Sequence, residues 1–389
     1  MGPYPNLRNL DYFLFVMEMD SAAAAPLAPD DRTNGEAAPL ADGGGNVPDT
    51  DGYFSSYESF EVHRLMVGDK PRTEAYRAAI QASRHLFQDK VVLDIGAGTG
   101  ILSLFAAQAG ARRVYAVEAS GFHELARQNA ERNGFGDVVR VVHGRIEDVA
   151  LPEQADVIVS EWMGFYLLHE SMLDSVIVGR DRFLAPDGVM FPDVARLYAC
   201  PSTLAAFHCD QLQCWSRPYG LDLTAVGEAA RRSMQQAPQV LDTHPEELLA
   251  APELVLELHL QYVTAEELAA VTCRRFVTVT RPGPYRGLCL WFECHFPDGS
   301  RLDTAPRAPS THWRQTAVVL PTDYPLEVDT VIGWELTLAR EAGGGRKYRI
   351  ALSMLDEDDE HPVPCGCAVG KCRLIKALID KEDAECDEG

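Results

Sequence analysis

The order of apolar and polar positions predicts alternating strands and helices in the first half of the chain. Short β-branched runs end at glycines or polar residues, and segments of helical spacing follow them. The predicted strands are residues 90–95, 113–117, 138–143 and 155–160, and the predicted helices are residues 101–109, 121–133 and 170–183. Strands that alternate with helices are typical of a parallel sheet covered on both faces. We therefore predict an α/β, Rossmann-like domain here.

After Pro192 the pattern changes to strands separated by turn-rich stretches. The predicted strands are residues 196–200, 254–262, 272–280, 288–296, 316–321, 332–339 and 348–354. Helical candidates are short, and residues 224–236 are an example. This succession predicts a second, all-β domain, a barrel or a sandwich.

The two ends of the chain differ from both patterns. Residues 21–48 are rich in Ala, Gly, Pro and Asp, whereas residues 356–360 and 380–388 are mostly acidic. Such segments bury little apolar surface, so we expect them to be solvated. In chain order, we expect a disordered extension at 1–50, the α/β domain at 51–192, the β domain at 193–355 and an acidic tail at 356–389.

The formal net charge of −23 and the pI near 4.8 narrow the class of partner. Phosphate groups need a basic surface, so nucleic acid is not expected as a direct ligand. An acidic protein attracts cationic partners instead. The sequence shows no apolar run of membrane-spanning length and no cationic flank of a signal peptide, so we expect a cytoplasmic or nuclear protein without a membrane partner.

Three of the ten cysteines lie close together in the chain, at Cys365, Cys367 and Cys372. Their spacing matches no common zinc pattern, and His361 alone among the histidines is near them. We therefore assign no metal ligand from the sequence and expect free thiols in a flexible tail. A metal site remains the alternative.

A glycine-rich loop after the first predicted strand indicates a nucleoside site. Residues 92–100 read VLDIGAGTG, with an acid, Asp94, ahead of the glycines Gly96, Gly98 and Gly100. Glycines allow a sharp turn and a close approach of ligand to backbone, and the next helix offers free N–H groups. Glu118 ends the second strand, where an acid accepts hydrogen bonds from ribose hydroxyls. Glu147 follows the third strand and either faces the adenine or is a solvated acid.

Two glutamates in residues 160–172, SEWMGFYLLHESM, suit a guanidinium. Glu161 and Glu170 are nine apart, so one continuous helix would place them on opposite faces. Gly164 interrupts the segment, and a loop can turn both carboxylates inward. A guanidinium offers five N–H donors in a planar fork, which two carboxylates can bind. Two unrelated acids are the simpler reading of either glutamate alone.

Four segments together resemble protein arginine methyltransferases over about residues 50–355. Residues 92–120 resemble the cofactor-binding half of class I methyltransferases, and residues 160–172 resemble the family's double-E loop. Residues 51–77 are similar to its N-terminal YFxxY helix with the HxxM and DxxRT motifs, and residues 311–313 match its THW loop. Residues 213–223 resemble the dimerisation arm, which we place near 209–223.

The resemblance implies S-adenosylmethionine as cofactor, a β-barrel after the α/β domain, a ring-shaped homodimer and arginine-containing basic proteins, such as histone tails or Arg/Gly-rich proteins, as substrates. The implied catalytic residues are Glu161, Glu170 and His312, with His312 paired to Asp69 or relaying a proton. The implied cofactor-binding residues are His63, Met66, Arg72, Asp94, Gly96, Gly98, Gly100, Glu118 and Glu147, and Arg72 would pair with the cofactor carboxylate. The implied substrate-binding residues are Tyr57, Met163, Met172 and Trp313.

Product type and activity are further implications of the resemblance. Relatives that make asymmetric dimethylarginine carry methionine at the positions of Met66 and Met172 together with THW, so mono- and asymmetric dimethylarginine are expected. The chain departs from the family pattern at Arg64, Leu65, Phe165 and His169. Two other functions therefore stay open: a methyltransferase acting on a small molecule or nucleic acid, and a catalytically weak dimeric adaptor that binds S-adenosylmethionine.

Overall fold

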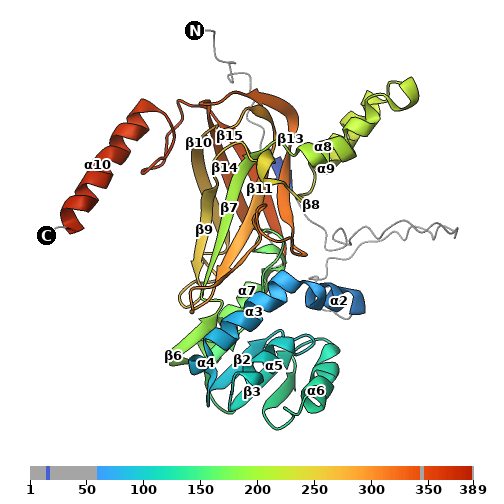
Figure 1. Ribbon diagram of the computed structural model, residues 1–389, viewed down its shortest axis with the longest axis vertical. Coiled ribbons are helices and arrows are strands. Elements are labelled where there is room, and N and C mark those ends of the chain that lie inside the picture. The colour runs from blue at the N-terminus through green and yellow to red at the C-terminus, as the bar shows by residue number, and fades with distance from the viewer. Residues whose placement is uncertain (1–14, 18–58, 342–345, 388–389) are drawn as a thin grey trace.

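The computed structural model describes residues 15–17, 59–341 and 346–387, and it contains a Rossmann-like domain followed by an antiparallel β domain (Figure 1). The first domain is built on a five-stranded sheet in the order β4-β3-β2-β5-β6, in which every neighbouring pair is parallel. Its strands are β2 (Val91–Ile95), β3 (Arg113–Glu118), β4 (Val139–His143), β5 (Ala155–Val159) and β6 (Leu184–Phe191). All residues of β2 are buried, as a central strand between two layers requires.

The strand order reverses at β2, because β3 and β4 lie on one side of it and β5 and β6 on the other. In an open α/β sheet, ligands bind beyond the carboxyl ends of the strands at such a point. The helices of this domain are α2 (Phe60–Gly68), α3 (Lys70–Ala82), α4 (Arg84–Phe87), α5 (Ile101–Gln108), α6 (Phe122–Arg132) and α7 (Met172–Phe183). The start of α3 is set locally: the side chain of Asp69 accepts a hydrogen bond from the Arg72 N–H, and proline follows at the first turn.

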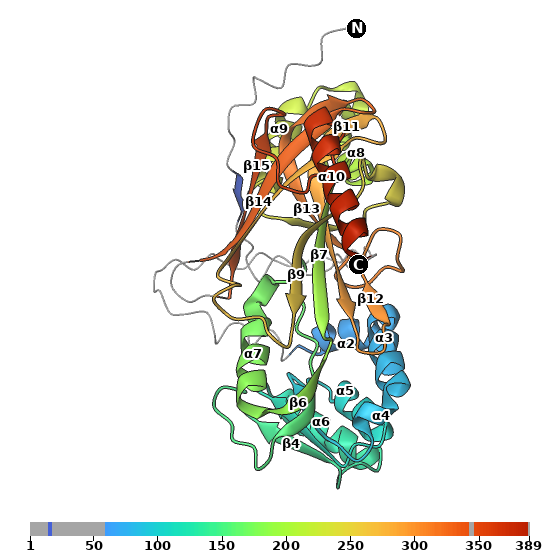
Figure 2. The ribbon, with the colours of Figure 1, turned by 90° about the vertical axis from the view of Figure 1, so that its left-hand side faces the viewer.

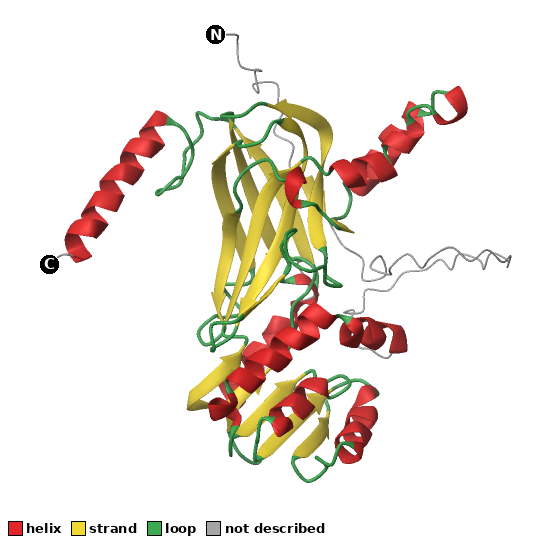
Figure 3. Ribbon diagram, viewed as in Figure 1, coloured by secondary structure: helices red, strands yellow, loops and turns green. Residues whose placement is uncertain are grey.

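The second domain consists of two antiparallel sheets around an apolar core (Figure 3). One sheet has the order β1-β15-β14-β10, and the other β8-β13-β11-β7-β9 with β12 paired to β11. The strands are β7 (Val194–Ser202), β8 (Gln239–Leu241), β9 (Glu253–His259), β10 (Ala270–Thr278), β11 (Gly283–His295), β12 (Arg301–Asp303), β13 (Gln315–Leu326), β14 (Val331–Arg340) and β15 (Tyr348–Leu355). The predicted α/β domain and β-barrel are both confirmed.

Two helical elements leave the barrel on different sides (Figure 1). The first contains α8 (Ala205–Gln211), two short 3-10 turns and α9 (Thr224–Met234), so the arm is longer than the predicted 209–223. Tyr219 at its end is fully exposed, and Leu221 is 65% exposed. The second is α10 (Gly370–Asp387), near the C-terminus.

Two expectations for the ends of the chain are wrong where the structure describes them. The disordered extension was expected to include residues 15–17, but these form β1 (Phe15–Met17), which pairs antiparallel with β15. The exposed edge of β15 offers unpaired backbone groups that an apolar segment can satisfy. The tail was expected to be flexible, but its cysteines Cys365, Cys367 and Cys372 are buried against the barrel, and α10 follows them.

Candidate active site

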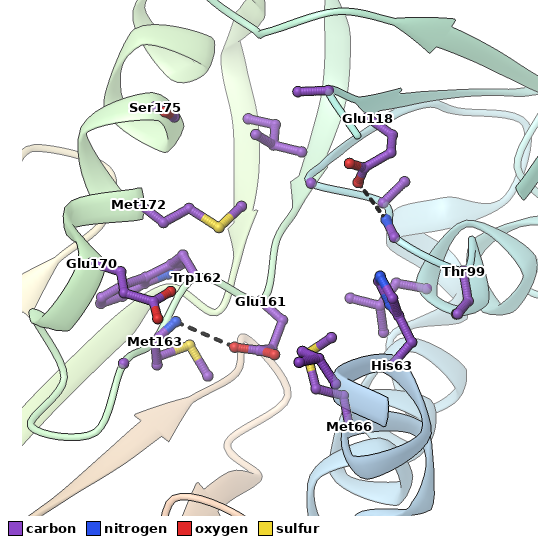
Figure 4. Close-up of a pocket in the computed structure, with 18 of the residues that line it drawn as sticks. His63, Met66, Thr99, Glu118, Glu161, Trp162, Met163, Glu170, Met172 and Ser175 are labelled. Atoms are coloured by element: carbon purple, nitrogen blue, oxygen red, sulfur yellow. Dashed lines mark hydrogen bonds between the residues drawn. The ribbon is translucent and has the colours of Figure 1, made fainter. Parts of the chain in front are cut away.

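A cavity of about 480 Å³ lies where α2, the loops after β2 and β3, the double-E loop (residues 160–172) and the loop at 311–313 meet (Figure 4). Most residues singled out from the sequence line it. They are His63, Met66, Arg72, Gly96, Gly98, Glu118, Glu147, Glu161, Met163, Glu170, Met172, His312 and Trp313. Tyr57 lies outside the described residues. Segments far apart in the chain therefore converge on one site, as the motif order implied.

The glycine loop is shaped by two close contacts. Gly96 and Gly98 have φ angles of +73° and +53°, a region that L side chains rarely adopt. A Cβ atom on Gly96 would lie 2.3 Å from the Met172 side chain, and one on Gly98 would lie 3.1 Å from the His63 ring. Glycine at both positions lets α2 and α7 approach the loop from opposite sides. The result is a narrow cradle that suits a nucleoside held by backbone groups.

Glu118 fixes this loop and still faces the cavity. Its carboxylate accepts hydrogen bonds from the Gly98 N–H and the Ser120 N–H, both at 2.7 Å. A carboxylate has about four lone-pair directions, so two backbone donors leave capacity for a further pair of hydroxyls. The Glu118 side chain lines the cavity beside Gly98 (Figure 4). This arrangement fits a ribose diol and supports the predicted role.

Asp94 and Gly100 were expected to contact the cofactor, but neither lines the cavity. Asp94 points beneath the loop, where its carboxylate accepts a 2.6 Å hydrogen bond from the Ser103 hydroxyl, and burial raises its pKa to about 7. Gly100, with φ of +81°, lies against Ala126 on α6. The sequence motif identifies the loop, but it does not separate residues that touch a ligand from those that pack the turn.

Glu161 is held by an arginine of the same chain. The Arg72 guanidinium donates to one Glu161 oxygen at 2.9 and 2.7 Å, and it also donates to the Met66 carbonyl at 3.1 Å. The other Glu161 oxygen accepts from the Met163 N–H at 3.2 Å. Both charged side chains are less than a tenth exposed, so this pair is a fixed part of the site. The structure shows Arg72 positioning Glu161, and the predicted pairing of Arg72 with the cofactor carboxylate stays a prediction.

The double-E loop does turn both glutamates inward. Gly164 and Leu167 exchange backbone hydrogen bonds of 3.0 and 2.9 Å across a tight turn. A Cβ on Gly164 would lie 2.4 Å from the His169 carbonyl oxygen, so the turn requires glycine. Glu170 then adopts a left-handed backbone with φ of +69°, just before α7. The prediction that Gly164 breaks a continuous helix is confirmed, and Glu161 and Glu170 face the same cavity (Figure 4).

His169 lies beside Glu170 but does not form a charged pair with it at neutral pH. The His169 Nε2 and a Glu170 oxygen are 3.9 Å apart. Burial, together with the positive charge of Lys347, lowers the pKa of His169 to about 4. The ring is therefore neutral, and its Nδ1 lies 3.2 Å from the Tyr166 hydroxyl. His169 therefore lies beside Glu170 without a charge of its own.

The loop at 311–313 ties the β domain to the site. His312 places its Nδ1 and its backbone N–H 2.7 and 2.8 Å from the same Asp69 oxygen, which confirms the predicted pairing. Burial alone would raise the pKa of Asp69, but the hydrogen bonds from His312 and Arg72 outweigh it and lower that pKa. The Trp313 indole donates to the Met163 carbonyl at 3.0 Å. Both contacts position the double-E loop and α3 relative to the barrel.

Ser175 and Trp162 are among the cavity residues that were not identified from the sequence. The Ser175 hydroxyl donates to Glu147 at 2.7 Å, which turns that carboxylate toward the cavity. Ser175 is one helical turn after Met172, so spacing on α7 was the available signal. Trp162 is buried in the cavity wall, and its indole nitrogen has no hydrogen-bond partner among the described residues. It lies inside the double-E loop, where the sequence singles out the two glutamates and not the tryptophan.

Comparison with known proteins agrees with this geometry. The family described as "Arginine methyltransferase oligomerization subdomain" matches residues 193–357, and "Methyltransferase domain" matches residues 92–188. Among curated relatives, the probable protein arginine N-methyltransferase 6 of Arabidopsis thaliana is 36% identical over 77% of this chain and 78% of its own length. Protein arginine N-methyltransferase 1 of Chlamydomonas reinhardtii is 35% identical over 87% of this chain and 93% of its own.

Solved structures lead to the same family. The Trypanosoma brucei PRMT1 enzyme-prozyme heterotetrameric complex with AdoHcy has a TM-score of 0.70 and 32% identity, covering 80% of this chain and 97% of that one. A PRMT6-SAH crystal structure has a TM-score of 0.67 and 28% identity, covering 76% of this chain and all of that one. The chain therefore belongs to the protein arginine N-methyltransferase family, S-adenosylmethionine-dependent enzymes that methylate arginine residues of proteins.

Proposed function

We propose that this enzyme forms mono- and asymmetric dimethylarginine in basic proteins, and that it does so as a homodimer. The observation that carries the proposal is the position of Glu161 and Glu170 on one cavity with the glycine loop and Glu118 (Figure 4). One part of the cavity fits a nucleoside and the other offers two carboxylates. A guanidinium seated on these carboxylates lies next to the nucleoside part.

The bound cofactor supplies a methyl group on a positively charged sulfur. The protein residues hold the acceptor. Glu161 and Glu170 bind the substrate guanidinium through its forked N–H groups and draw its positive charge toward them, which leaves the remaining terminal nitrogen a better nucleophile. Arg72 keeps Glu161 in place and cancels one of the two negative charges. Most of the rate then comes from positioning the guanidinium against the methyl group.

The product assignment rests on the two methionines. Met66 on α2 and Met172 on α7 both line the cavity, and Met172 lies against the glycine loop. Together with the 311–313 loop they match relatives that transfer two methyl groups to one terminal nitrogen. Mass spectrometry of the product distinguishes asymmetric from symmetric dimethylarginine by their fragment ions. Symmetric dimethylarginine alone would contradict the assignment.

The substrate class and the dimer rest on charge and exposure. The net charge of −23 favours cationic, arginine-rich segments such as histone tails or Arg/Gly-rich proteins.

The arm that ends at Tyr219 exposes Leu221 and Val226 to solvent in the single chain. A second subunit would cover these apolar side chains. Size measurement in solution tests this, and Tyr219→Asp with Leu221→Asp should give monomers. A cytoplasmic or nuclear location is also part of the proposal, and imaging of the tagged protein tests it.

The main test is transfer from methyl-labelled S-adenosylmethionine to a histone H4 tail and to an Arg/Gly-rich peptide. Each peptide has a control with lysine in place of arginine. We expect label only on the arginine peptides, and a loss of at least about a hundredfold in kcat for Glu161→Gln, because the neutral amide removes a charge-assisted contact. Cofactor binding, measured separately, should persist. Tight cofactor binding without transfer to either peptide would instead favour an adaptor.

A further inference from the structure

The C-terminal segment after β15 gathers four side chains far from the active site. The chain turns at Asp356–Asp359, where the Asp356 N–H donates to the Asp359 side chain at 2.8 Å. It then returns along β10, where the Ala368 N–H donates to the Thr278 hydroxyl at 2.7 Å. This return brings together His361, Cys365, Cys367 and Cys372.

The four candidate ligand atoms are close enough together to bind one metal ion. The three sulfurs lie 3.5, 3.4 and 3.3 Å from the Nδ1 atom of His361, and all four atoms lie within 4.8 Å of one another. Zinc bonds of about 2.3 Å to sulfur and about 2.0–2.1 Å to nitrogen, at tetrahedral angles, place sulfur and nitrogen about 3.6 Å apart. The observed separations are close to that value.

The orientation of His361 favours a ligand role. Its Nε2 lies 3.1 Å from the Glu357 carbonyl oxygen, which can only accept, so Nε2 carries the proton and Nδ1 presents its lone pair to the sulfurs. The ring also stacks on Phe276 of β10, with centroids 3.6 Å apart and planes at 11°. A metal-bound histidine is usually held in this way by its second nitrogen.

Hydrogen bonding among the four groups does not satisfy them. One imidazole lone pair can accept one proton, yet three thiols surround it, and thiols are weak donors. Each of the three cysteines is less than a tenth exposed, and all are free of disulfide bonds. A cation that accepts all four lone pairs removes this mismatch.

We infer that His361, Cys365, Cys367 and Cys372 bind one Zn²⁺ as a structural site. Three sulfurs and one nitrogen are a borderline-soft set that favours zinc over magnesium or calcium, which prefer oxygen. Four protein ligands in the tetrahedron leave no position for water or substrate, so the site is not catalytic. Binding releases the thiol protons and gives three thiolates, one neutral imidazole and one dication, with a net charge of −1.

The site would fix α10 to the barrel. Cys372 lies in the first turn of α10, whereas the other three ligands precede the helix. The apolar contacts here form a small cluster of the three cysteines with Phe276 and Leu355, and α10 extends from it beside the barrel (Figure 2). Leu374 and Leu378 are 65% and 56% exposed, so few other contacts orient these turns of the helix. Removing zinc should therefore release α10 from the barrel.

The metal content of tag-free full-length protein tests the inference directly. Elemental analysis after extensive dialysis should give about one zinc per chain. The double variant Cys367→Ser, Cys372→Ser should contain less than about a tenth of that amount, and the control Cys209→Ser, at an exposed cysteine of the arm, should retain it. Zinc retained in the double variant would place the metal elsewhere and overturn the inference.

Cobalt substitution covers the case of a variant that does not fold. Wild-type protein stripped of metal and supplied with Co²⁺ should show the visible absorption bands of tetrahedral cobalt with thiolate charge transfer. No zinc in the protein as purified and no cobalt spectrum, with circular dichroism showing a folded chain, would overturn the inference. A mass 2 Da lower under non-reducing conditions would do the same, because it indicates a disulfide within the cluster. None of these readouts depends on methyl transfer.

Discussion

His169 allows a prediction whose magnitude follows from the structure. It is 4% exposed beside Glu170, and burial lowers its pKa from 6.5 to about 4. Between these two values the unfolded chain binds a proton that the folded chain does not, so the free energy of unfolding falls as the pH falls from 6.5 towards 4. At pH 5 this difference amounts to about 2 kcal/mol, a factor of about 30 in the ratio of folded to unfolded protein.

The substitution His169→Phe removes the titrating group and keeps an aromatic ring. It also removes the partner of the Tyr166 hydroxyl, which costs about 1 kcal/mol at any pH. The informative quantity is therefore the change between pH 8 and pH 5, measured by urea unfolding. We expect wild type to lose about 2 kcal/mol more than the variant over this interval. All other titrating groups are shared and cancel.

The exposed His85 on α4 provides the matched control. His85→Phe should leave the pH dependence of unfolding the same as in wild type. If His169→Phe and wild type lose the same free energy of unfolding within about 0.5 kcal/mol, His169 is not held neutral by the fold. The assignment of Glu170 as a carboxylate beside a neutral ring would then be wrong.

Two more predictions concern the cradle and the contact between domains. Gly98→Ala should weaken S-adenosylmethionine binding, measured by calorimetry, about five- to thirtyfold, because φ of +53° costs an L residue about 1–2 kcal/mol. Gly68→Ala, where a Cβ meets nothing within 4 Å, should leave the affinity unchanged. Asp69→Asn should lower the free energy of unfolding by about 1.5–3 kcal/mol at pH 7, because one amide oxygen cannot serve both His312 and the start of α3. Because the fold lowers the pKa of Asp69, this stabilisation is present above the unfolded pKa of about 4 and is lost as the pH falls through the folded pKa. The difference in free energy of unfolding between variant and wild type should therefore shrink below pH 4. A difference that stays constant to pH 3 would contradict this account.

The regular part of the fold could be predicted because burial and periodicity agree there. Strand β2 is apolar except for Asp94 and buried along its whole length, and segments of helical spacing follow it. Edge elements have weaker signals. Strands β1, β8 and β12 have three residues each, which is too short to distinguish from a loop in the sequence. Hydrogen bonding to a neighbouring strand stabilises their extended conformation, which their own sequences do not specify.

The C-terminal segment shows why composition misled. Residues 356–360 and 380–388 are acidic, and that bias predicted a flexible tail around the three cysteines between them. Their burial depends on Phe276, which is 89 residues before Cys365 in the chain. A contact of that separation leaves no periodic trace in the local sequence. The metal alternative was set aside because the cysteine spacing matches no common zinc pattern and only His361 is near, and the placement of the side chains now leads us to propose it.

The active site belongs to neither domain alone. The double-E loop with its two glutamates lies before the domain boundary near residue 192, but residues after the boundary hold this loop in place. Trp313 donates to the Met163 carbonyl, and Arg346 donates to the Glu170 carbonyl at 3.2 Å. The glycine loop and Glu118, by contrast, are complete within the first domain. The position of the glycine loop and Glu118 could therefore be predicted from a short stretch of the sequence. Presentation of the acceptor carboxylates depends on packing against the barrel, which the sequence could indicate only through its likeness to a family.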